Sequence, residues 1–82
     1  MSVLLTLYSK PGCHLCEALR ALLDELQPEY GFLLEEIDIT GDGALFARYR
    51  HAIPVLLVDG REIARGNVSE RDLVPLLKSI SP

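Results

Sequence analysis

The sequence predicts an α/β fold in which four strands form one mixed sheet flanked by three helices, in the order β-α-β-α-β-β-α. Two almost fully apolar runs, at positions 3–8 and 55–58, have the length of strands that are covered on both faces. A leucine stripe at helical spacing follows the first run, and an Asp-Gly pair follows the second. A helix between two strands gives a parallel pair, whereas an Asp-Gly turn gives an antiparallel hairpin, so the sheet is expected to be mixed.

The first two elements are a strand and an amphipathic helix. Residues 3–8 form the strand, which Ser9, Pro11 and Gly12 stop, and its apolar character predicts a central position in the sheet. The helix is expected to stop at Pro28. Its apolar face is built from residues at offsets of 3, 4, 7, 8 and 11: Leu15, Ala18, Leu19, Leu22, Leu23 and Leu26.

The middle of the chain predicts an edge strand and a short helix. Residues 32–39 alternate only partly, with three acidic residues among apolar ones, which is typical of an exposed edge. Residues 42–50 can form two helical turns capped by Asp42, with Leu45 and Tyr49 on one face.

The last third predicts a hairpin and a helix. The apolar run 55–58 and residues 61–65 flank Asp59-Gly60, the pair favoured in a two-residue type I′ turn. The final helix has two possible starts, at Ser69 with a capping box or at Asp72 with Pro75 in the first turn. Its buried face is the same in either case: Leu73, Leu76, Leu77 and Ile80.

Length, charge and cysteine content narrow the function classes. A chain of 82 residues has room for one core, so residues 1–82 are expected to form a single domain. The protein is also expected to be a monomer. The net charge of −4 argues against nucleic acid and anionic membranes as partners. The N-terminus does not have the pattern of a secretory signal, which predicts a cytoplasmic protein whose cysteines serve chemistry rather than structure.

The two cysteines, Cys13 and Cys16, follow a strand and a Pro-Gly turn and lie in the first turn of the predicted helix. Free backbone N–H groups and the helix dipole favour negative charge there, which predicts that the Cys13 thiol has a pKa lowered from about 8.5 toward 7 or below. Cys13 is therefore the expected nucleophile, and Cys16, one turn further, the residue that resolves a mixed disulfide.

Neighbouring residues can tune this pair. Lys10 and a protonated His14 would favour the thiolate, although both can equally be ordinary exposed side chains. Zinc binding by these cysteines with His14 and His51 is a weaker alternative, because a second ligand pair at standard spacing is absent, so no metal is assigned.

The segment YSKPGCHLC after the first strand, with IPVLLVDG about forty residues later, resembles the glutaredoxins and more broadly the thioredoxin fold. Small glutaredoxin-like proteins with a CHLC motif are the most similar group. The resemblance implies a thioredoxin-like fold and a cis-proline at Pro54 facing the cysteines. It also implies that the Ile53 backbone binds an extended substrate and that Tyr8 is the aromatic residue beside the cysteines.

The resemblance also concerns glutathione. Gly66 and Asn67 occupy the region that meets the γ-glutamyl end of glutathione in the family, where this chain keeps only one of two glycines. Arg50 and His51 can hold a carboxylate, or Arg50 can be a solvated charge at a helix end. Glutathione is therefore a possible co-substrate, and no bound cofactor is expected.

Together these features predict a thiol–disulfide oxidoreductase with a Cys13-His14-Leu15-Cys16 dithiol, acting on disulfide-containing proteins or low-molecular-weight thiols. Glutathione or a thioredoxin-reductase-type enzyme would supply the electrons. Two alternatives use the same cysteines: a metal or iron–sulfur carrier, and an interaction module whose partner binding depends on the disulfide.

Overall fold

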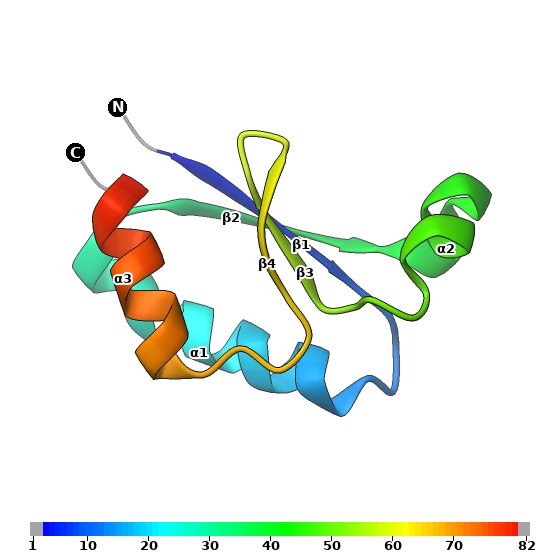
Figure 1. Ribbon diagram of the computed structural model, residues 1–82, viewed down its shortest axis with the longest axis horizontal. Coiled ribbons are helices and arrows are strands. Elements are labelled where there is room, and N and C mark those ends of the chain that lie inside the picture. The colour runs from blue at the N-terminus through cyan, green and yellow to red at the C-terminus, as the bar shows by residue number, and fades with distance from the viewer. Residues whose placement is uncertain (1–2, 81–82) are drawn as a thin grey trace.

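The computed structural model describes residues 3–80, and the order of its elements is the predicted one (Figure 1). One sheet contains the strands β1 (Leu4–Ser9), β2 (Leu33–Asp38), β3 (Val55–Val58) and β4 (Arg61–Arg65). The helices of this part of the chain are α1 (His14–Tyr30), the 3₁₀ helix η1 (Ile39–Gly41), α2 (Gly43–Tyr49) and α3 (Glu70–Ile80). The predicted fold class, a four-stranded mixed sheet with three α-helices in the thioredoxin-like order, is confirmed.

The strands lie in the order β2-β1-β3-β4. Helix α1 crosses between β1 and β2, so these strands run parallel, whereas β1 pairs with β3 in the antiparallel sense. This confirms that the first strand is central and that the second lies at an edge.

The sheet separates two apolar clusters. On one face, α1 and α3 pack against residues such as Leu5 and Leu56 (Figure 1). On the other face, α2 packs Tyr49 against Val55 and Leu57. Because successive residues of a strand point to opposite faces, β3 contributes to both clusters, which explains why all four of its residues are apolar and buried.

The hairpin between β3 and β4 has the predicted turn. Asp59 and Gly60 have φ angles of 48° and 87°, and positive values at both central positions define a type I′ turn. The pairing of β3 with β4 shifts register between Leu56, which lies opposite Ala64, and Leu57, which lies opposite Glu62. Ile63 is therefore an extra residue on β4, which is a β-bulge.

Helix α1 buries a narrower face than predicted. Cys16 and Leu19 begin the buried row, whereas Leu15 is 46% exposed and Ala18 is exposed, so their assignment to the core is wrong. Leu15 and Ala18 lie at one edge of the apolar stripe, in line with Leu22, and even that residue is only half-buried. The spacing of apolar residues gives the width of a stripe but not which of its edges another element covers.

The end of α1 also differs from the prediction. The helix continues through Pro28 to Tyr30, because a proline in the last turn removes only one backbone hydrogen bond, to the exposed Asp24. The helix ends instead at Gly31, whose φ of 70° is left-handed and whose N–H donates to the Gln27 carbonyl at 2.8 Å.

Helix α3 starts at the first of its two possible positions. The Ser69 hydroxyl accepts a hydrogen bond from the Asp72 N–H at 3.2 Å, and the helix begins at Glu70. Of the predicted buried face, Leu73 and Leu77 are buried, and Leu76 and Ile80 are half-buried. Across residues 3–80, no helix combines the length and apolar character that crossing a membrane requires.

Candidate active site

The two cysteines form a disulfide at the first turn of α1. Cys13 is the N-cap of the helix, with extended backbone angles, and its Sγ accepts a hydrogen bond from the Cys16 N–H at 3.2 Å. The Cα atoms of the pair are 5.2 Å apart, within the range that a disulfide spans. Gly12, with a φ of 79°, makes the turn that brings the chain from β1 to this cap.

The two sulfur-bearing residues differ in exposure. Cys13 is half-buried at the rim of the molecule, whereas Cys16 is 2% exposed and faces the sheet. Cys13 is therefore the more accessible residue of the pair. The nucleophile and resolving roles of the two cysteines stay predictions.

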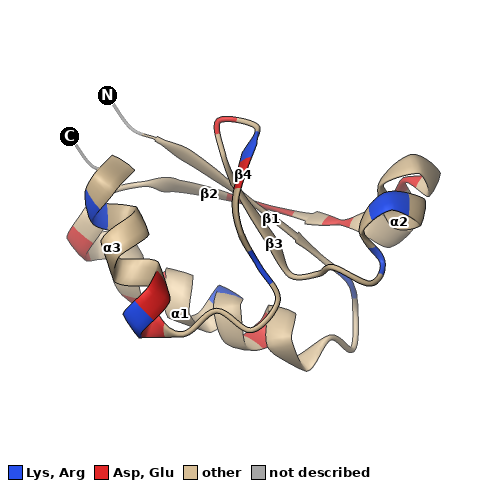
Figure 2. Ribbon diagram, viewed as in Figure 1, with Lys and Arg blue, Asp and Glu red and all other residues tan. Residues whose placement is uncertain are grey.

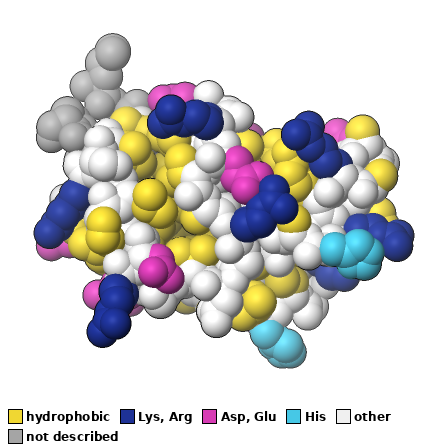
Figure 3. Space-filling view, in the orientation of Figure 1, with side chains coloured by type: hydrophobic (Ala, Val, Ile, Leu, Met, Phe, Trp, Pro, Cys, Tyr) yellow, Lys and Arg dark blue, Asp and Glu magenta, His cyan; other side chains and the backbone are white. Residues whose placement is uncertain are grey.

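The residues between the cysteines project outward. The His14 side chain is 96% exposed, and its Nδ1 lies 3.8 Å from Glu17 Oε2. Figure 3 shows histidine side chains standing out from the molecular surface. Leu15 adds exposed apolar surface beside the disulfide, a role that the sequence reasoning missed because it placed Leu15 in the core. The spacing of the apolar residues gave no signal for this exposure, because Leu15 fits the stripe and only the structure shows that the buried row is Cys16, Leu19, Leu23 and Leu26.

Pro54 lies at the same end of the sheet as the cysteine segment. Tyr8 of β1 pairs with Val55, so Pro54 adjoins the end of β1 from which the cysteine loop departs. Pro54 is fully buried, its peptide bond with Ile53 is cis, and its carbonyl accepts a hydrogen bond from the Gly66 N–H at 2.8 Å. The structure thus brings together Pro54 and Gly66, two residues that the sequence predicted for the site. Asn67, the next residue in the chain, is exposed.

Tyr8 and Ile53 contribute side chains to the other face of the sheet. The Tyr8 ring packs on Tyr49 with ring centroids 5.0 Å apart, and Ile53 packs against the same cluster under α2. Helix α1 covers the opposite face, so the Tyr8 ring lies in the smaller core.

Basic residues gather at the end of the molecule that carries α2 (Figures 2 and 3). Arg50 Nε donates to His51 Nε2 at 3.1 Å, and its guanidinium lies 5.8 Å from the centre of the Phe46 ring. Arg50 is also the C-cap of α2, where a positive charge complements the helix dipole. Both interpretations from the sequence, a carboxylate contact and a helix-end charge, fit this position.

Lys10 lies on a hollow of about 360 Å³ beside the cysteine loop. Ser9 and Pro11 line it together with Glu17, Glu36 and Asp38. Figure 2 shows the acidic positions along β2 that contribute to this wall. Lys10 is therefore the basic member of a largely acidic hollow.

Comparison with known proteins identifies the family. Residues 4–78 match the family described as "Glutaredoxin-like domain (DUF836)". The chain belongs to this glutaredoxin-like family. It is 36% identical over 72 residues to an uncharacterized protein of Mycobacterium tuberculosis, an alignment that covers 82% of this chain and 74% of that protein.

Solved structures show the same fold. A protein of Nitrosomonas europaea solved by NMR is 31% identical, with a TM-score of 0.78 over 93% of this glutaredoxin-like chain and 92% of that one. A thioredoxin mutant from Halobacterium salinarum has a TM-score of 0.76 over 99% of this chain and 76% of that one, at 23% identity. The fold and the close cysteine pair of this glutaredoxin-like protein fit a redox function.

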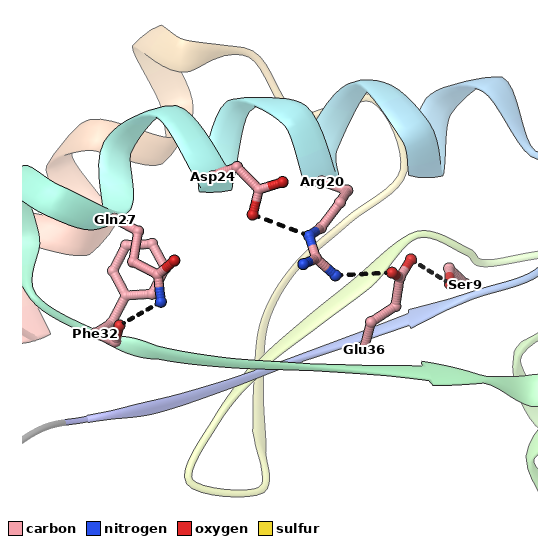
Figure 4. A network of polar contacts seen from close by, with 6 residues as sticks. All are labelled: Ser9, Arg20, Asp24, Gln27, Phe32 and Glu36. Carbon is pink, nitrogen blue, oxygen red and sulfur yellow. Dashed lines mark hydrogen bonds and ion pairs between the residues drawn. The ribbon is translucent and has the colours of Figure 1, made fainter.

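A polar network beside the cysteines was also missed from the sequence (Figure 4). Ser9 donates to Glu36, and Arg20 contacts both Glu36 and Asp24. The hydrogen bond with Asp24 is the main cause that raises the pKa of Arg20. The signal in the sequence was a serine at the end of a largely apolar strand, but its partner depends on the pairing of β1 with β2.

Proposed function

We propose that this glutaredoxin-like protein is a thiol–disulfide oxidoreductase in which Cys13 is the nucleophile and Cys16 the resolving residue. One observation carries the proposal: a disulfide joins the half-buried N-cap of α1 to a buried cysteine one turn further along the helix. Such a pair offers one accessible sulfur and keeps the second within reach of it.

The reaction has two displacement steps. In the reduced protein the Cys13 thiolate attacks a substrate disulfide, forming a mixed disulfide and expelling one substrate sulfur, which takes up a proton. The Cys16 thiol then loses its proton and attacks Cys13 Sγ. The Cys13–Cys16 bond forms, and the second substrate sulfur leaves as a thiol. The substrate gains two electrons and two protons, which the protein dithiol supplies.

The start of α1 stabilises the reactive form of Cys13. In the oxidised state its Sγ accepts a hydrogen bond from the Cys16 N–H. The same N–H is proposed to stabilise the Cys13 thiolate of the reduced protein. The positive end of the helix dipole acts in the same direction. Lys10 and His14 are proposed to add positive charge near the thiolate.

The substrates are proposed to be disulfide-containing proteins or low-molecular-weight mixed disulfides, with glutathione as a possible co-substrate. Exposed Leu15 gives a protein substrate an apolar contact beside the disulfide. The Ile53 backbone is proposed to bind an extended substrate next to Cys13. The family resemblance adds further candidate binding residues: Tyr8, Arg50, Gly66 and Asn67.

The test is to mix the reduced protein with a glutathione mixed disulfide and, separately, with a protein disulfide. Each reaction is coupled either to glutathione with its reductase or to thioredoxin reductase. We expect turnover of at least one substrate, and the productive coupling identifies the electron donor. Absence of turnover in all four combinations would contradict the proposal.

The carrier alternative has a separate readout. Among residues 3–80, no three His, Cys, Asp or Glu side chains lie close enough together to hold a metal ion. Under the oxidoreductase proposal, protein purified without oxygen is expected to be colourless, with two reactive thiols per chain. A coloured preparation with bound iron would favour the carrier.

A further inference from the structure

Glu36 connects the two ends of the chain segment that carries the cysteines (Figure 4). Ser9 is the last residue of β1 and lies four positions before Cys13, whereas Arg20 lies four positions after Cys16 on α1. Glu36, on the edge strand β2, accepts a hydrogen bond from each of them. The cysteine segment is thus closed at both ends onto one carboxylate.

Both oxygens of this carboxylate are occupied. Ser9 Oγ donates to Oε2 at 2.8 Å, and Arg20 Nη1 donates to Oε1 at 2.8 Å. Arg20 Nε in turn donates to Asp24 at 3.0 Å, which holds the guanidinium in place along the helix. Hydrogen bonds to a charged acceptor are shorter and stronger than neutral ones, so the geometry of this network is well defined.

The Ser9 end of the network is buried. Ser9 is 6% exposed and is the one buried polar residue found among residues 3–80. Its side chain lies on the same face of β1 as Leu5 and Leu7, the face that α1 covers. Glu36 therefore ties the sheet to α1 directly beneath the segment that the proposed chemistry uses.

We propose that Glu36 is a positioning residue that holds the start of α1 against the end of β1 and so keeps Cys16 within reach of Cys13. The proposal rests on the dithiol function proposed above. The resolving step depends on it, because that step forms the Cys13–Cys16 bond while breaking the bond between Cys13 and the substrate. Its rate and equilibrium rise with the effective concentration of one sulfur at the other.

A purely stabilising role predicts a different result. The Arg20 and Glu36 side chains are 39% and 36% exposed, and ion pairs at that exposure add little to stability. The signature of positioning is therefore a change in the redox couple with little change in unfolding temperature.

The experiment compares Glu36→Gln and Ser9→Ala with Asp38→Asn. Glu36→Gln replaces the charged acceptor at the centre of the network, whereas Ser9→Ala removes its donor on β1 without a change of charge. Asp38→Asn removes a charge from the hollow beside the cysteine loop, which Glu36 also lines. It leaves the Glu36 network intact, because Asp38 accepts its hydrogen bonds from Thr40. The measurements are the equilibrium of the Cys13–Cys16 disulfide with dithiothreitol and the rate of thiol release from a preformed glutathione mixed disulfide.

We expect Glu36→Gln and Ser9→Ala to lower the equilibrium constant for disulfide formation by about three- to tenfold, tenfold being about 30 mV for two electrons. Thiol release should slow by a similar factor, with Asp38→Asn close to wild type. Wild-type behaviour of both network variants would overturn the proposal, as would an equal shift in Asp38→Asn. The dithiothreitol equilibrium needs no enzymatic turnover, so this outcome is distinguishable from failure of the proposed function.

Discussion

The first turns of α1 and α3 have the same capping arrangement made from different atoms. At α3, the Ser69 hydroxyl accepts from the Asp72 N–H, and the Asp72 carboxylate accepts from the Ser69 N–H and hydroxyl. At α1, Cys13 Sγ accepts from the Cys16 N–H at the same distance of 3.2 Å. In each helix the two side chains belong to the cap and to the third helical residue.

The difference lies in how each turn is closed. At α3 the two side chains are exposed and joined by hydrogen bonds between oxygens. At α1 they are joined by a sulfur–sulfur bond. The gain of two electrons breaks this bond, and the loss of two electrons forms it again. The spacing of a helix start therefore explains why two residues separate the cysteines. It places a cap side chain beside the side chain of the third helical residue, so either a capping box or a disulfide can form there.

The sharpest way to test this comparison is to give α1 an oxygen cap. Cys13→Ser should keep the helix start, because serine is a strong N-cap, but reduce disulfide turnover to the background rate. Turnover with the productive electron donor and thermal unfolding of the reduced proteins measure the two properties. Residual turnover in Cys13→Ser would place the nucleophile elsewhere.

Replacing the partner of the cap should stop the reaction halfway. Cys16→Ser leaves Cys13 able to attack, so one substrate thiol should remain attached per chain, because the resolving sulfur is gone. Intact-mass measurement after mixing with a glutathione mixed disulfide detects the adduct. If the doubly substituted Cys13→Ser, Cys16→Ser protein formed the same adduct, attachment would not involve this pair.

At α3 the same cap position should affect stability alone. Ser69→Ala should lower the free energy of unfolding by about 1 kcal/mol and leave the disulfide equilibrium unchanged. Urea unfolding measures the first property. Ser79→Ala is the matched control, since Ser79 donates to the Leu76 carbonyl at the other end of the same helix and should cost less. A redox change in Ser69→Ala would contradict the separation of the two roles.

The smallest expected effect is a change in the pH dependence of unfolding, caused by a third helix cap. Asp38 caps η1, and its hydrogen bonds with Thr40 hold the pKa of this carboxyl below its ordinary value. The contribution of Asp38 to stability is therefore present above the unfolded-state pKa and is lost as the pH falls through the lower folded value. Asp38→Asn should weaken the acid dependence of unfolding below about pH 4, as followed by thermal melts. An unchanged acid dependence would show that this cap is not coupled to protonation.

Features encoded locally were predictable from the sequence. The apolar runs of β1 and β3, the Asp42 cap and the Asp59-Gly60 turn each depend on residues close together in the chain. The cysteine pair at a helix start is of the same kind. These local signals gave the order of the elements and the centre of the candidate site.

Features that depend on tertiary contacts were not predictable. Leu15 and Ala18 are exposed because no element within residues 3–80 covers that edge of α1, and the spacing of α1 itself does not reveal this. The Glu36 network requires the parallel register that sets Leu7 opposite Glu36. The hydrogen bond between Gly66 and Pro54 requires the bulged register of β3 with β4. Each depends on which residues the sheet brings opposite one another.

The proposed function requires the Cys13–Cys16 bond to be a reversible two-electron centre rather than a structural link. The most direct test is a redox titration of the wild-type protein in thiol buffers of stepped potential, followed by intact mass after alkylation of free thiols. We expect a single two-electron transition with a midpoint between about −120 and −270 mV, the range of thiol–disulfide oxidoreductases. A midpoint below about −300 mV, typical of structural disulfides, would contradict the proposed function, as would a pair that does not oxidise within the titrated range.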